Sequence, residues 1–110
     1  MNEERTTYDT GGSLPMTIEA FRNRPCSLLF SDPKYTQPEP QEVAQLIRLA
    51  GWSQNQVANL VGVNSDPKRG SSTIRKWKSH KAKDDHRPIP YSAWRLMLLH
   101  AGVVSLDLKV

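Results

Sequence analysis

The chain has 110 residues, of which 37% are hydrophobic and 24% charged, and its formal net charge is +4 at pH 7. This length gives room for one domain of ordinary core size plus a tail, and it argues against a two-domain enzyme. No apolar run approaches the roughly 20 residues needed to cross a bilayer, and the first residues are unlike a signal peptide's basic start. We therefore expect a cytoplasmic protein with no membrane partner. A lone cysteine, Cys26, excludes an internal disulfide and a structural zinc site of the usual kind.

The positive charge is concentrated in one short stretch. The first 40 residues hold more acidic than basic side chains, whereas residues 66 to 83 contain seven lysines and arginines against a single aspartate. In a chain with a pI near 9.5, such a concentration is typical of a protein that binds a polyanion. The alternative is a basic face that serves only solubility.

Residues 1–38 are predicted to form an N-terminal arm, partly disordered or packed on the core. They are rich in Thr, Ser, Gly and Asn, and four prolines interrupt any long helix or central strand. Thr17 is placed to cap a short turn that contains Phe21. The apolar run of residues 28–30 is suited to lie across the folded core, where we expect it.

Residues 39–110 are predicted to form an all-α domain of four main helices. Apolar residues recur at helical spacing after Pro40, and Gly51 is the natural end of this first helix. Ser53 caps the second helix, with Gln56 as its partner in a capping box, and Gly62 ends it.

A turn of residues 64–70 separates the second helix from the third, which Ser71 or Ser72 caps and which runs to about residue 79. Ile74 and Trp77 are the inward anchors of this third helix, so its outer face is almost wholly cationic. The three tryptophans are assigned to the core rather than to base stacking.

The fourth helix extends from Tyr91 to a stop at Gly102. Beyond it, residues 103–110 alternate apolar and polar side chains, which predicts a short C-terminal strand. A single strand is not stable alone in water, so it is expected to pair with the arm or with the same strand of a second copy.

The second and third helices match the pattern of a helix-turn-helix. The signal is Ser53-Gln54-x-x-Val57-Ala58-x-x-Val61-Gly62-Val63, followed by Ser72-Thr73-Ile74-x-x-Trp77. On these residues the chain resembles the Cro/cI-type (XRE-like) repressors, in which the second helix braces on the DNA backbone and the third lies in the major groove. The turn between the helices, residues 64–69, is about six residues longer than in that family.

A closer resemblance is to the anti-CRISPR-associated autorepressors of phages and mobile elements. It rests on the Ser-Gln-x-x-x-Ala second helix and on the string Arg87-Pro88-Ile89-Pro90-Tyr91 before the fourth helix. The resemblance implies a homodimer that binds a palindromic operator in double-stranded DNA and represses its own operon. This sequence lacks the arginines that those proteins carry early in the second and third helices, so the phosphate contacts are expected to have moved to Lys68 and Arg69.

The resemblance and the chemistry of the side chains select two sets of DNA-binding residues. Hydroxyls and cations at the start of the third helix are expected to contact base edges, and donors around it are expected to contact phosphates. The base-reading set is Ser71, Ser72, Thr73, Arg75 and Lys76, and the phosphate-binding set is Ser53, Gln54, Lys68, Arg69, Lys78 and Lys81. For Ser53 the capping role comes first, and for Lys81 a plain charged linker is an even alternative.

Enzymatic functions find no support in the sequence. Cys26 has no histidine at a spacing that pairs them, and residues 84–86 form a solvated charge run rather than a metal site. We expect no catalytic residue, metal, cofactor or small-molecule substrate. The alternatives are an antitoxin or accessory protein-interaction module on a helix-turn-helix scaffold and, last, an RNA binder that uses the same basic stretch.

Overall fold

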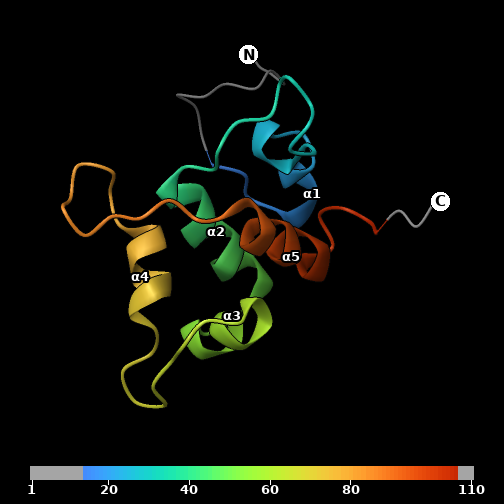
Figure 1. The fold of residues 1–110 in the computed structure, drawn as a ribbon. Coiled ribbons are helices and arrows are strands. Elements are labelled where there is room, and N and C mark those ends of the chain that lie inside the picture. The colour runs from blue at the N-terminus through green and yellow to red at the C-terminus, as the bar shows by residue number, and fades with distance from the viewer. Residues whose placement is uncertain (1–13, 107–110) are drawn as a thin grey trace.

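The computed structural model describes residues 14–106, and over that range the chain forms helices and no strand. The elements are α1 (Ile18–Phe21), the 3-10 turn η1 (Pro25–Ser27), α2 (Pro40–Ala50), α3 (Gln54–Val61), α4 (Ser72–Lys78) and α5 (Tyr91–Ala101). Helices α2 to α5 are the four predicted main helices, so the all-α prediction is confirmed. Helix α2 lies at the centre, with α4 on one side of it and α1 on the other (Figure 1).

Local capping sets the ends of these helices. The Ser53 hydroxyl accepts a hydrogen bond from the Gln56 backbone N–H at 3.1 Å, and the Gln56 side-chain oxygen accepts one from the Ser53 N–H at 2.7 Å. This reciprocal pair satisfies two N–H groups that a helix start leaves open. Gly51 and Gly62 end α2 and α3 in the left-handed conformation, at φ +76° and +82°. The predicted capping box and both stops are confirmed.

The core is built where α2, α3, α4 and α5 meet. Trp94 of α5 is fully buried, and Ile74 and Trp77 point inward from α4 as predicted, at 0% and 4% exposure. Trp52 is half-buried and packs against the same cluster. The other fully buried apolar side chains of these helices include Leu46, Val57, Ala58, Met97 and Leu98.

The N-terminal segment contributes to this core through residues other than the predicted ones. Thr17 caps α1, its hydroxyl accepting from the Ala20 N–H at 3.1 Å, as predicted. The expectation that residues 28–30 cover the core is wrong for Leu29 and Phe30, which are 56% and 67% exposed. Phe21 takes that place, because the short helix α1 sets its ring edge-on to Trp94. Residues 1–13 of the predicted arm lie outside the described residues.

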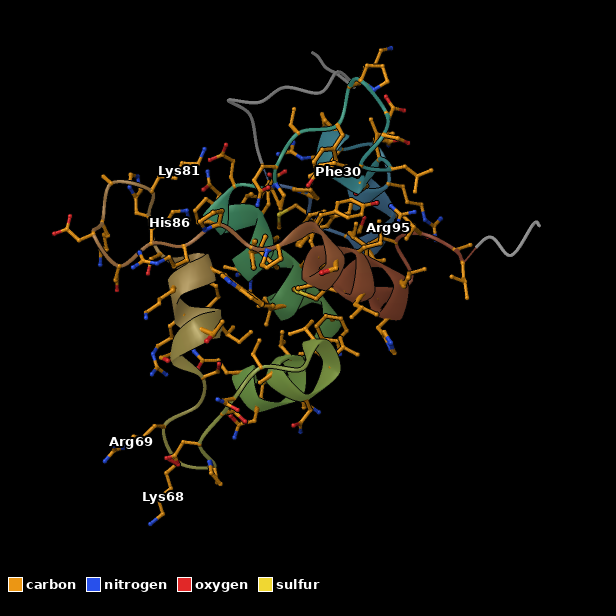
Figure 2. The ribbon with its side chains drawn as sticks, viewed as in Figure 1. Phe30, Lys68, Arg69, Lys81, His86 and Arg95 are labelled. Atoms are coloured by element: carbon orange, nitrogen blue, oxygen red, sulfur yellow. The ribbon has the colours of Figure 1, made fainter. Side chains whose placement is uncertain are left out.

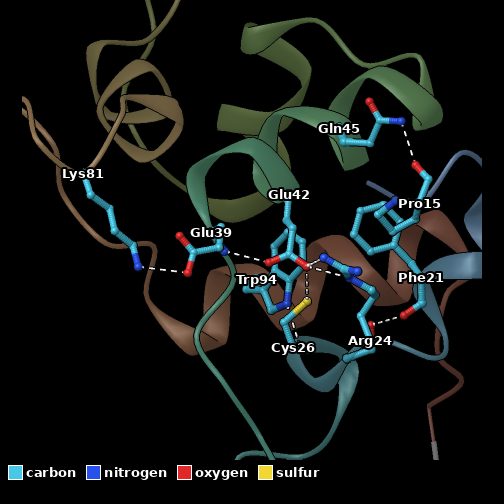
Figure 3. Close-up of polar contacts among 10 residues, drawn as sticks. Pro15, Phe21, Arg24, Cys26, Glu39, Glu42, Gln45, Lys81 and Trp94 are labelled. Atoms are coloured by element: carbon cyan, nitrogen blue, oxygen red, sulfur yellow. Dashed lines mark hydrogen bonds and ion pairs between the residues drawn. The ribbon is translucent and has the colours of Figure 1, made fainter. Parts of the chain in front are cut away.

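Polar contacts hold the same segment to the helices (Figure 3). The Arg24 guanidinium lies 2.8 Å from the Glu42 carboxylate at the start of α2, and the buried Cys26 thiol lies 3.6 Å from the same carboxylate. The Trp94 indole N–H donates to the Cys26 carbonyl at 2.8 Å. Burial first, and then the Glu42 carboxylate, raise the pKa of the Cys26 thiol above its usual range.

The predicted C-terminal strand is absent from residues 103–106, the part of it that the structure describes. Gly102, at φ +85°, reverses the chain, and the Val103 N–H donates to the Leu98 carbonyl at 2.9 Å. Val103 is thereby buried against the end of α5, the hydrophobic contact that accompanies such a helix end. Residues 107–110 of the predicted strand lie outside the described residues. Among residues 14–106, none of the helices has the length and hydropathy to cross a membrane.

Candidate nucleic-acid interface

Helices α3 and α4 pack on the core through their inner faces and leave their outer faces to solvent. Val57 and Ala58 of α3 and Ile74 and Trp77 of α4 are buried. Because these residues fix which way each helix is turned, the opposite positions of α4 are accessible. Of the predicted base-reading residues, Ser72 and Arg75 are exposed and Thr73 and Lys76 are half-buried.

Ser71 differs from the rest of the predicted base-reading set. It is 1% exposed, and its hydroxyl accepts a hydrogen bond from the Ile74 backbone N–H at 3.3 Å. The hydroxyl therefore caps α4, a role that satisfies an open N–H of the helix start. A buried capping hydroxyl does not reach a base edge, so Ser71 is corrected from a base-reading to a capping residue.

Gln54 connects α3 to the start of α4. Its side-chain oxygen accepts hydrogen bonds from the Ser71 backbone N–H at 2.9 Å and from the Arg75 guanidinium at 3.1 Å. The side-chain amide nitrogen is the donor that Gln54 can offer to a phosphate, and the oxygen contacts hold that group beside the first turn of α4. The sequence gives no sign of this bridge, because nothing local to Gln54 indicates a partner 17 residues further along the chain.

The turn between the two helices is closed by its own backbone. Asp66 and Gly70 exchange two hydrogen bonds, at 2.7 and 2.8 Å, as an isolated antiparallel pair. The Asp66 carboxylate accepts from the Lys68 N–H at 3.1 Å, and the Asn55 side chain of α3 donates to the Asp66 carbonyl at 3.2 Å. We call residues 66–70 the basic turn, after the exposed Lys68 and Arg69 at its tip.

The basic turn projects from the molecule (Figure 2). Lys68 and Arg69 point away from the helices, beyond the first turn of α4. A shallow groove of about 310 Å³ runs between this turn and the start of α3. The groove is lined by Ser53, Gln54, Asn55, Pro67, Lys68, Arg69, Gly70 and Arg75. It brings together four predicted phosphate-binding residues and one predicted base-reading residue in a polar, largely cationic surface.

Two predicted phosphate-binding residues lie elsewhere. Lys81 follows the other end of α4 (Figure 2) and forms an ion pair with Glu39 at 2.9 Å, in which both side chains are substantially exposed. Lys78 is half-buried and lines a separate hollow together with Arg48 and Trp52. The structure therefore separates Lys78 and Lys81 from the groove. Among the described residues, no group of potential ligands could hold a metal ion.

Comparison with known proteins identifies the relatives of this chain. No model of a protein family matches it. Two proteins of Escherichia coli, both described as transcriptional repressor protein KorC, do match. One is 37% identical over 70 residues, which cover 64% of this chain and 73% of the relative. The other is 30% identical over 73 residues, 66% of this chain and 76% of the relative.

These matches show the chain's relation to a repressor, but they do not test the finer resemblance. The resemblance to Cro/cI-type or anti-CRISPR-associated repressors stays a prediction. Both relatives are repressors by description, and each alignment covers more than two thirds of the relative. The chain belongs to the family of the transcriptional repressor KorC.

Proposed function

We propose that the protein is a sequence-specific DNA-binding repressor without catalytic activity. Membership of a repressor family supports this function. The observation that carries the proposal is the accessible side of α4, where Ser72 is exposed and Thr73 and Lys76 are half-buried, on the helix whose Arg75 lines the cationic groove. Hydroxyls and a lysine at the start of an exposed helix can donate to and accept from base edges in a major groove.

The two helices then divide the work of a helix-turn-helix. Helix α4 is the recognition helix, and Ser53 and Gln54 at the start of α3 contact the phosphate backbone beside it. Lys68 and Arg69 add backbone contacts from the basic turn. Lys78 and Lys81 neutralise phosphates further along the strand without reading sequence.

Repression follows from occlusion. We propose that the protein acts as a homodimer on a palindromic operator, with the two α4 helices in successive major grooves about 34 Å apart. The face of α5 and the residues that follow it are the proposed dimer surface. A dimer seated over a promoter excludes polymerase without a cofactor or a chemical step. The proposed operator belongs to the protein's own operon on a phage, plasmid or integrative element.

The test is binding of the purified protein to the DNA immediately upstream of its own reading frame. Fluorescence anisotropy against that duplex and against a scrambled duplex of equal length and composition measures the specificity ratio. We expect a preference of at least about a thousandfold, the lower end for specific DNA-binding proteins. Equal affinity for both duplexes contradicts the proposal, and copurification of a protein partner in that case favours an interaction module.

A further inference from the structure

Arg75 is the one predicted base-reading residue whose charged group already has partners within the chain, as far as the described residues go. Its guanidinium donates to the Arg69 backbone carbonyl at 2.5 Å and to the Gln54 side-chain oxygen at 3.1 Å. One acceptor lies in the basic turn and the other on α3, while Arg75 itself belongs to α4. The side chain thus joins three segments at one point.

These contacts add to the bonds by which α3 already holds the first residue of the turn and Ser71, the residue that follows it. The backbone pair of Asp66 and Gly70 closes the turn, and Asn55 attaches its first residue to α3. Arg75 attaches the other strand of the turn, at Arg69. With both strands fixed, the direction in which Lys68 and Arg69 project is set before any ligand arrives, which lowers the ordering cost of binding.

We propose that Arg75 is a positioning residue, which locks the basic turn so that Lys68 and Arg69 meet the phosphodiester backbone next to the bases that α4 contacts. The inference rests on the proposed function and changes the predicted role of Arg75 from reading bases to holding the turn. Both hydrogen bonds come from the same terminal nitrogen, Nη1, whose two N–H groups can serve one acceptor each. A base contact by Nη1 would require it to give up at least one of its present oxygen acceptors.

The partner of the basic turn is the DNA backbone rather than a base edge. Lys68 and Arg69 are exposed cations at the tip of a turn, and phosphate contacts of this kind raise affinity for all sequences alike. Arg75 should therefore influence affinity and its salt dependence, and leave the ratio between operator and scrambled duplex unchanged.

The experiment compares four variants with the wild-type protein on both duplexes between about 0.05 and 0.2 M salt, a range over which phosphate contacts change affinity steeply. They are K68A/R69A, R75A, R75K and the triple variant K68A/R69A/R75A. We expect K68A/R69A to weaken binding to both duplexes by about tenfold per phosphate contact and to flatten the salt slope by roughly two units. R75A should act in the same direction, and R75K should fail to restore affinity because the lysine Nζ ends one bond short of the position that Nη1 of Arg75 occupies.

The triple variant decides between the two roles of Arg75. If Arg75 acts through the turn, the triple variant binds as K68A/R69A does, within about twofold, since the groups it positions are already gone. Three results would overturn the inference. They are an affinity loss in the triple variant equal to the product of the losses in K68A/R69A and R75A, recovery of affinity in R75K, and an affinity loss for R75A on the operator alone. Thermal unfolding of each variant checks that the fold is kept. If the wild-type protein shows no preference for the operator, the proposed function is wrong. This outcome is distinct from a failure of the inference about Arg75.

Discussion

The side-chain oxygen of Gln54 lies beside Gly70, so close that a Cβ at residue 70 would overlap it. Gly70 also has a φ of +80°, which residues other than glycine adopt only with strain. The same oxygen accepts from the Ser71 N–H and the Arg75 guanidinium. Any side chain at residue 70 therefore disturbs the junction between α3, the basic turn and α4.

We expect Gly70→Ala to reduce the affinity for DNA by more than its effect on folding stability explains. The methyl group displaces Gln54 and with it both hydrogen bonds to the start of α4. Gly62→Ala is a matched control, because Gly62 has nearly the same φ, +82°, and a Cβ there would meet nothing within 4 Å. Both substitutions should cost about 1 to 2 kcal/mol of stability in urea unfolding, whereas only Gly70→Ala should reduce affinity in the anisotropy assay. An equal loss of affinity for the two would show that the Gln54 contact does not matter.

Base reading by α4 predicts a loss confined to the operator. Ser72→Ala or Lys76→Ala should cost about 1 to 3 kcal/mol of binding free energy on the operator and little on scrambled DNA. Ser31→Ala and Lys34→Ala, in the segment before α2, are matched surface controls, since both residues are exposed. Equal losses on both duplexes would mean that these side chains do not read sequence.

The Arg24–Glu42 pair predicts that stability depends on contacts with the N-terminal segment. Glu42→Gln leaves the Arg24 guanidinium, whose side chain is 16% exposed, without its opposite charge. We expect a loss of about 3 kcal/mol in urea unfolding, because an unpaired charge stays largely buried. Lys81→Met removes the exposed pair with Glu39 and should cost less than about 1 kcal/mol. Similar effects of the two substitutions would argue against a structural role for the buried pair.

The environment of Cys26 predicts an unreactive thiol. Because burial and the neighbouring Glu42 carboxylate raise its pKa, the reactive thiolate is scarce at neutral pH in the folded protein. Labelling with a thiol-specific disulfide reagent should be slow without denaturant and should increase in parallel with the unfolded fraction in urea. A native rate close to that of free cysteine would contradict the packing of this segment.

The parts of the fold that can be predicted are those with local signals. The Ser53–Gln56 capping box and the stops at Gly51, Gly62 and Gly102 each depend on residues within about one helical turn. Such signals remain valid whatever the tertiary arrangement. They set the bounds of α2, α3 and α5 almost to the residue.

The predictions that failed concern burial and strand formation, which depend on residues distant in the sequence. Phe21 and Phe30 are both apolar residues of the N-terminal segment, but Phe21 meets the buried ring of Trp94 in α5, whereas Phe30 packs on Tyr35 and Tyr91 and stays exposed. Burial of Ser71 likewise depends on the packing of α4, and its N–H bonds to Gln54 across 17 residues. The predicted strand also fails over residues 103–106, because the chain turns back after Gly102 and Val103 covers the end of α5 instead of extending into a strand.

Arg22, next to α1, donates hydrogen bonds to the carbonyls of Gly102 and Val103 at 3.1 Å each. These two contacts join the N-terminal part of the described chain to its C-terminal part. Phe21 beside Arg22 fills the centre of the molecule. We therefore expect that helices α3 and α4 do not keep their structure when they are separated from the rest of the domain. A shortened protein or a fusion intended to carry its DNA-contacting surface must bring the whole of residues 14–104 with it.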